Sequence, residues 1–168
     1  MLPLFAGAAT REESLEYPVK AAFLTKFGEF VTWPEESFPG PDDPVAVCVM
    51  GPDPFGAHLD RIAETQTVGQ RPITIRRMAP PDEASDCHIL YLSTEREDAI
   101  HDMLRQLAGK PVLTVTDAAN AGDARGVVHF VIRDNRVRFH IDSGTAARNG
   151  LTISSKLLSL ALTVTKRG

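Results

Sequence analysis

Hydrophobic positions recur at three- and four-residue spacings along the first part of the chain. They form one stripe, which consists of Val19, Ala22, Phe23, Phe27, Phe30 and Val31. This spacing predicts an amphipathic helix from Glu13 to Val31, because residues three and four apart share one helix face. Trp33-Pro34 ends the predicted helix, since the residue before a proline is disfavoured in the helical region. Trp33 stands beside a loop, so we expect it at the surface.

Beyond this helix, short apolar runs alternate with segments of helical spacing. The runs predict strands at Val45–Met50, Ile73–Arg77, Cys87–Leu92 and Pro111–Thr116. One helix is predicted from Phe55 to Glu64, with Asp53 as its N-cap. A second is predicted from a cap at Ser93 or Thr94 to Leu107. Such alternation is typical of a parallel sheet that is covered by helices.

The last part of the chain predicts a different arrangement. His129–Arg133 and Arg136–His140 flank Asp134-Asn135, two residues that tolerate positive φ and are typical of a two-residue hairpin turn. Such a turn places Arg133 opposite Arg136, and the pairing continues outward until His129 lies opposite His140. We therefore predict an antiparallel hairpin, which is followed by an amphipathic helix over Leu151–Leu162.

Alternation along the two strands gives this hairpin two unlike faces. The predicted core face consists of Phe130, Ile132, Val137 and Phe139. The opposite face, called the cationic face below, consists of His129, Arg133, Arg136, Arg138 and His140. Two interpretations of the cationic face remain open: a solvated sheet surface, or a surface that binds an anion, a ligand or a partner protein. A metal site at the two imidazoles would need a third ligand, which the spacing does not specify.

Composition and length limit the class of protein. The chain has 168 residues and no repeat or linker, and 43% of its residues are apolar. We therefore predict an α/β fold: a single-domain sandwich, mostly parallel sheet with a C-terminal antiparallel hairpin and flanking helices. No apolar run approaches the roughly 20 residues of a membrane-spanning helix. The net charge of -4 disfavours nucleic-acid binding as the main function.

The N-terminus and the cysteines bear on the cellular compartment. An apolar start runs into Ala6-Gly7-Ala8, the small-residue pattern of a signal-peptidase site. We interpret residues 1–9 as a signal-peptide remnant or a disordered end, and residues 10–168 as the domain. Cys48 and Cys87 are the only cysteines, and from the residues alone a disulfide and two buried free thiols are equally open. Export to an oxidising compartment would favour the disulfide.

The motifs of several enzyme classes are missing from the sequence. The loop Gly51–Gly56 lacks the glycine fingerprint of dinucleotide-binding proteins, and neither a phosphate-binding Gly-Lys-Ser/Thr loop nor a Gly-x-Ser-x-Gly elbow occurs. Cys87 and His88 are adjacent in a predicted strand, so they point to opposite faces and cannot act as a nucleophile–base pair. We predict no catalytic residues, no cofactor and no metal.

Several spaced motifs resemble the YfiR-like family of periplasmic proteins. In order along the chain they are Glu16–Pro34, Cys48–Gly56, Val68–Pro72, Cys87–Tyr91, Pro111–Asp117, Asn135–Phe139 and Gly150–Leu158. The resemblance covers nearly the whole chain from Glu16 to Ala161. It implies a periplasmic, homodimeric, non-enzymatic regulator in which Cys48 and Cys87 form an intramolecular disulfide.

The resemblance also implies a partner. Family members bind the periplasmic part of an inner-membrane diguanylate cyclase and hold it inactive, so that their loss raises cyclic di-GMP and promotes biofilm formation. Release is linked to envelope stress, redox state or an outer-membrane partner, here expected to be a lipoprotein. We expect the contacts to a partner or ligand to come from Trp33, Arg133, Arg136, Arg138, His129 and His140. The alternative is a periplasmic sensor that binds a small molecule.

Overall fold

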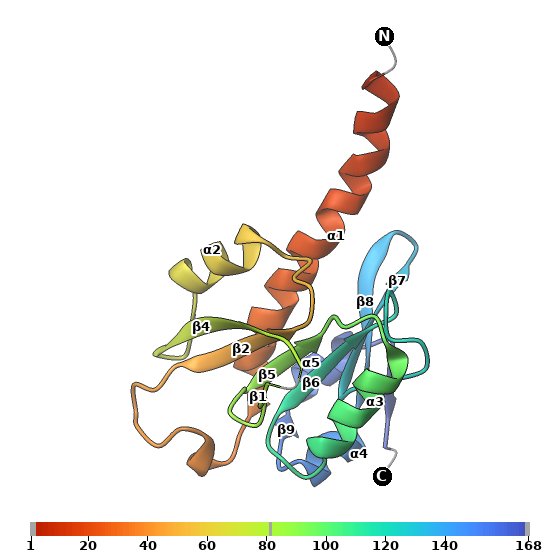
Figure 1. Cartoon of the computed structure of the whole chain (residues 1–168). Helices are drawn as coiled ribbons and strands as arrows, with labels where there is room; N and C mark the ends of the chain where they lie inside the picture. Colours follow the sequence, from red (N-terminus) through yellow and green to blue (C-terminus); the bar gives the residue numbers. More distant parts are fainter. Residues whose placement is uncertain (1–2, 81, 167–168) are drawn as a thin grey trace.

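In the computed structural model, which describes residues 3–80 and 82–166, the expected strands join one main sheet (Figure 1). Within these residues its order is β10-β8-β7-β6-β5-β2-β4-β3. The parallel strands are β2 (Val45–Met50), β4 (Arg71–Met78), β5 (Ile89–Leu92), β6 (Leu113–Asp117) and β7 (Val128–Arg133). β8 (Arg136–Asp142) is antiparallel to β7, β10 (Thr163–Thr165) is parallel to β8, and β3 (Thr67–Val68) is antiparallel to β4. The predicted mostly parallel sheet with a C-terminal hairpin is confirmed.

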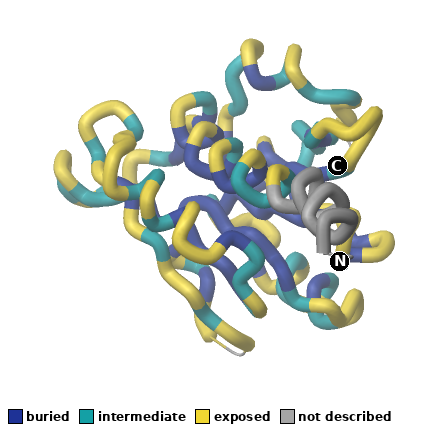
Figure 2. Tube along the Cα trace, turned by 90° about the horizontal axis from the view of Figure 1, so that it is seen from above, coloured by how far each residue is buried: buried dark blue, intermediate teal, exposed yellow. Residues whose placement is uncertain are grey.

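Helices cover both faces of this sheet. One buried layer joins it to α1 (Pro3–Phe30), α2 (Ala57–Thr65) and α5 (Ser155–Leu160), and the other joins it to α3 (Glu97–Gln106). Alternate residues of β2 enter the two layers, which explains why its six residues are all buried. In Figure 2 the buried residues follow the strands, and the exposed residues follow the loops around them. The prediction of flanking helices is confirmed.

The disulfide lies in the layer on the side of α3. Cys48 of β2 is bonded to Cys87, which stands two residues before β5, and their Cα atoms are 6.0 Å apart. This confirms the pairing that the family resemblance implied. The predicted signal-peptide remnant, residues 1–9, lies outside the residues whose side chains the structure describes, so it stays a prediction.

Two predicted helix ends are wrong because side chains make other bonds. Asp53 does not cap a helix at residue 55: α2 begins at Ala57, and the Asp53 carboxylate accepts from the Phe55 amide at 2.8 Å and pairs with Arg77 at 2.8 Å. Ser93 does not cap α3, which begins at Glu97. Its hydroxyl donates instead to the carbonyl of Met50, at 3.0 Å, and so ties the end of β5 to that of β2.

The predicted helix over Leu151–Leu162 is also wrong, because strand pairing divides the segment. β9 (Thr152–Ile153) pairs with β1 (Val31–Thr32), and this pairing also ends α1 one residue earlier than predicted. Ser154 then caps the short helix α5 by accepting from the Leu157 amide. The chain continues into β10, and α4 (Ser143–Arg148) precedes the segment.

Candidate functional site

The hairpin has the predicted register in every pair. Arg133 lies opposite Arg136, and His129 lies opposite His140, with the intermediate pairs in order. The turn residues Asp134 and Asn135 have φ values of 51° and 62°, as a two-residue turn of this type requires. The division of the side chains into two faces is therefore confirmed.

The core face of the hairpin is buried only at its base. Phe130 and Phe139 are buried against Phe27 of α1, at ring distances of 6.0 and 5.5 Å. Val137 is half-buried, and Ile132 is 45% exposed. The prediction that Ile132 lies in the core is wrong, since near the tip its side chain lines an open hollow together with Leu15 and Val19 of α1.

The cationic face is not evenly exposed. Arg133 and Arg136 are exposed, and Arg138 and His140 are half-buried, but His129 is only 1% exposed. Burial, helped by the nearby charge of Arg125, lowers the pKa of His129 to about 4. Burial also lowers the pKa of His140. Both imidazoles are therefore neutral at pH 7, and the arginines supply the charge of this face.

Trp33 does not lie at the surface. It is 7% exposed, and its indole nitrogen donates to the carbonyl of His88 at 3.2 Å. The expected exposure of Trp33 is wrong because the loop after it folds back and places Phe38 edge-on against the indole, with 6.1 Å between ring centroids. None of the five hairpin residues of the cationic face lines the hollow that Trp33 helps to form, so the structure does not bring the predicted site together.

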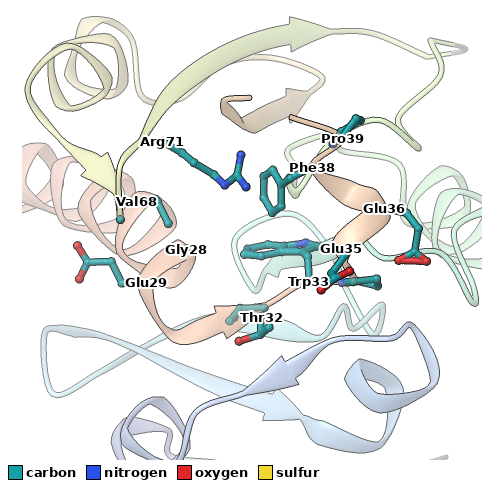
Figure 3. Close-up of a pocket in the computed structure, with 13 residues that line it drawn as sticks. Gly28, Glu29, Thr32, Trp33, Glu35, Glu36, Phe38, Pro39, Val68 and Arg71 are labelled. Carbon is teal, nitrogen blue, oxygen red and sulfur yellow. The ribbon is translucent and has the colours of Figure 1, made fainter. Parts of the chain in front are cut away.

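The Trp33 hollow, of about 810 Å³, lies between the end of α1, the short 3-10 helix Glu35–Ser37 and strands β3 and β4 (Figure 3). The guanidinium of Arg71 lies over the Phe38 ring, 4.0 Å from its centroid. One nitrogen of that guanidinium donates to the carbonyls of Gly40 and Asp43. The remaining charged groups that line the hollow are Glu29, Glu35 and Glu36, all exposed.

Most polar groups around this hollow bond to the backbone, although the buried Ser37 Oγ has no hydrogen-bond partner among the described residues. His88 accepts from the Ala46 amide through Nδ1, at 2.9 Å, and Nε2 lies 2.9 Å from the carbonyl of Ser37. This pattern assigns the proton to Nε2, and burial lowers the pKa of His88. Phe38 stacks on the imidazole at 4.2 Å. Gly28 lets β3 approach α1, because a Cβ there would stand 2.7 Å from Val68.

A second surface is apolar and open, and its residues belong to α1, the hairpin and α5. This α1–hairpin surface consists of Leu15, Val19, Phe23, Ile132, Val137 and Leu160. Two hollows of about 430 and 610 Å³ share Val19 and Phe23, so the surface is continuous. Leu15 is 60% exposed and Leu160 is 55% exposed. Charged residues line the same hollows, namely Glu16, Lys26 and Arg136.

Sequence analysis missed a buried charged network under α1. Lys20 is fully buried, and its ammonium lies 2.8 Å from the Asp117 carboxylate and also bonds Glu16. Tyr91 donates to the same Asp117 oxygen at 2.6 Å. Burial by itself would lower the pKa of Lys20. The hydrogen bonds to the two carboxylates have the larger combined effect, so the pKa is raised above its ordinary value. The signal was the position of Lys20, four residues before Leu24 on the buried side of the helix.

Some structural features bear on the class of protein. Across residues 3–80 and 82–166, no helix combines the length and apolar character that crossing a membrane requires. Among residues 15–80 and 82–166, whose side chains the structure describes, no three His, Cys, Asp or Glu side chains gather in a way that could hold a metal ion. Comparison with known protein families matches residues 17–162 to the family described as DUF4154, YfiR/HmsC-like.

Proposed function

The chain belongs to the YfiR/HmsC-like family, whose members regulate diguanylate cyclases, and on this premise we propose that it is a periplasmic repressor. It binds the sensor domain of an inner-membrane diguanylate cyclase and so controls cyclic di-GMP and biofilm formation. It acts by binding rather than by catalysis. The observation that carries the proposal is the family match over residues 17–162.

The disulfide supports the periplasmic part of the proposal. Disulfides persist in oxidising compartments such as the periplasm and are rare in the cytosol. Cys48 and Cys87 are both buried, and their bond joins two neighbouring strands of the sheet. Mass spectrometry of periplasmic and cytosolic fractions from the native host tests the location. Recovery of reduced protein from the cytosol would contradict it.

We propose the α1–hairpin surface as the contact to the cyclase. Exposed apolar side chains that gather in one patch are typical of interaction sites, and single exposed ones are not. Val19 joins two apolar hollows, and Ile132 lies in one of them beside Arg136. An apolar centre with arginine close by is a common composition of protein interfaces. Arg133 and Arg138 of the cationic face would contact the same partner from the hairpin.

The proposed mechanism is a shift of population in the cyclase. A regulator that binds the inactive conformation of the sensor domain more tightly than the active one favours the inactive conformation, by no more than its difference in affinity. The protein itself then needs no large rearrangement. A homodimer, and release through an outer-membrane lipoprotein, are further parts of the proposal. Analytical ultracentrifugation tests the homodimer. Affinity capture from native membranes tests the binding of both the lipoprotein and the cyclase.

Deletion of the gene, followed by measurement of cyclic di-GMP, tests the proposed function. We expect the level to rise and to return when the wild-type gene is restored. The variant L15S/V19S should fail to restore it, because it makes the centre of the α1–hairpin surface polar. V164S is the matched control, since Val164 is also exposed but lies outside both hollows. An unchanged level after deletion would contradict the repressor role.

A second candidate function is a periplasmic receptor for a small molecule. It is favoured by the Trp33 hollow, whose lining combines the aromatic rings of Trp33 and Phe38 with Arg71 and exposed glutamates. Thermal unfolding with amino acids, vitamins and cell-wall fragments tests it. A ligand at 100 times its Kd adds about 2.7 kcal/mol of stability. If none of these compounds raises the melting temperature, the protein is not a receptor for any of them.

A further inference from the structure

One nitrogen in the interior of the hairpin has no hydrogen-bond partner among the described residues. It is Nε2 of His129, a residue that is 1% exposed. Buried polar atoms in proteins are nearly always hydrogen-bonded, because an unpaired one loses its bonds to water without replacement. The environment of this atom therefore needs an explanation.

The neighbouring hydroxyl decides which nitrogen of His129 carries the proton. Thr116 Oγ1 accepts from the Gly126 amide at 2.9 Å, so its own hydrogen is free to donate. The His129 Nδ1 atom lies 2.8 Å away, whereas the alternative acceptor, the carbonyl of Val128, lies at 3.5 Å. The shorter contact makes Nδ1 the acceptor, so the neutral ring carries its proton on Nε2. His129 therefore offers an unused N–H donor.

His129 is one of the residues that line a hollow of about 230 Å³ on the cationic face. The hollow is lined by Arg125, Gly126, His129, His140, Ile141, Asp142, Thr163 and Thr165. One guanidinium nitrogen of Arg125 donates to the carbonyls of Gly122 and Ala124. Among the described residues Arg125 forms no ion pair with a carboxylate, so its charge is not neutralised by the protein there.

Several acceptors around the hollow are already engaged. Both oxygens of Asp142 accept from Thr145, one from its amide at 3.0 Å and the other from its hydroxyl at 2.8 Å. His140 Nδ1 lies 2.7 Å from the Thr163 hydroxyl. The hollow thus combines an unneutralised guanidinium and an unused N–H donor with acceptors that already have donors. The two donors suit an anion, although the Asp142 carboxylate in the same lining opposes it.

We propose that the hollow binds a small oxyanion, the phosphate or carboxylate group of a ligand, between the Arg125 guanidinium and the His129 Nε2–H. Its volume exceeds the roughly 30 Å³ that one water occupies in the liquid, so such a group has room. Because Nε2 is covered in the structure, the oxyanion reaches it only when a side chain that lines the hollow moves aside. This site is independent of the proposed repression of a cyclase.

Nuclear magnetic resonance of the imidazoles tests both the donor and the site. A long-range proton–nitrogen spectrum at neutral pH should show His129 protonated on Nε2. Inorganic phosphate and acetate are then titrated separately at constant ionic strength, and the His129 signals should shift with at least one of them. A response to phosphate alone assigns a phosphate group, and a response to acetate alone assigns a carboxylate.

Matched arginine variants complete the test. R125Q should weaken the binding about tenfold or more, as loss of a hydrogen bond from a charged donor does. R61Q, which removes an exposed arginine from α2, should bind as the wild type does. Protonation of His129 on Nδ1, the absence of any shift with either anion, or unchanged binding by R125Q would each overturn the proposal. Cyclic di-GMP levels report on the repressor function separately.

Discussion

The Trp33 hollow and the α1–hairpin surface both adjoin α1, yet they differ in what their side chains contact. Around the hollow, the indole of Trp33, both ring nitrogens of His88 and the guanidinium of Arg71 bond to carbonyls or amides of the protein itself. On the α1–hairpin surface, Leu15 and Ile132 are largely exposed to solvent. We call the surroundings of the Trp33 hollow the closed region, because these side chains bond within the protein. We call the α1–hairpin surface the open region, because its apolar side chains are exposed.

This difference indicates which side chains stabilise the fold and which are available to bind a partner. Groups that are paired within the protein contribute to its folding free energy, and a partner gains little by contacting them. Apolar groups that stay exposed contribute little to folding, but their burial by a partner favours association by about 25 cal/mol per Å². We therefore expect substitutions in the closed region to change stability, and substitutions in the open region to change function. The following predictions test that separation.

The largest effect should come from W33A. It removes a buried aromatic side chain and the donor to the His88 carbonyl, so we expect a loss of about 3–5 kcal/mol in the free energy of unfolding. Urea unfolding followed by circular dichroism measures it. The protein that remains folded should still repress the cyclase. A stable variant that has lost repression would place Trp33 at the partner interface. It would contradict the assignment of the closed region to stability alone.

Loss of the disulfide should be next in size. Cys87 directly precedes His88, so the bond to Cys48 holds the closed region in place. We expect C48A/C87A to be destabilised by about 2–4 kcal/mol, since the free energy of the unfolded chain falls when the cross-link is removed. Thermal unfolding with and without a reductant measures the loss. A reductant should not change the melting temperature of the variant, which serves as its own control.

Acid should lower the stability of the folded protein through its buried histidines. Burial lowers the pKa of His129 from 6.5 to about 4 and also lowers that of His88. Between these values the unfolded state binds more protons than the folded state, so stability falls as the pH drops from about 6.5 towards 4. Urea midpoints measured across this range should show the fall, and H129Q should reduce it. If the urea midpoint of H129Q falls with pH as steeply as that of the wild type, His129 does not contribute to the loss of stability.

The smallest change in stability should come from the open surface. L15S and V19S replace exposed side chains, so each should alter the free energy of unfolding by less than about 0.5 kcal/mol. Both should nevertheless weaken capture of the partner from native membranes, while V164S should not. A large loss of stability in L15S or V19S would show that this surface is covered within the folded protein or by a second copy.

Sequence reasoning predicted the local features of the fold. The register of β7 and β8 follows from a two-residue turn and the alternation of side chains, and both are local properties of Asp134-Asn135 and their neighbours. Short apolar runs identified β2 at Val45–Met50 and predicted β5 over Cys87–Leu92, although β5 begins only at Ile89. The segment Leu151–Leu162 was misassigned, because pairing of Thr152–Ile153 with β1 overrode its helical spacing.

The candidate site was predicted less well than the fold. Sequence patterns identified the arginines of the hairpin, but they placed Trp33 at the surface and Ile132 in the core, and the structure reverses both. Arg125 had no recognisable signal, and Lys20 had only its place on the buried side of the helix, since its partner Asp117 is distant in the sequence. The family resemblance identified the disulfide, which the residues alone had left open.

The order of apolar and polar residues by itself determined where the longer strands of the main sheet lie, where the hairpin turns and which side chains share a face. These properties depend on dihedral preferences and on neighbours within a few residues. Only the tertiary structure decided that His129 lies buried beside Thr116, that Lys20 meets Asp117, and that Ile132 near the hairpin tip stays exposed. Burial and charge pairing depend on segments that meet only after the chain has folded.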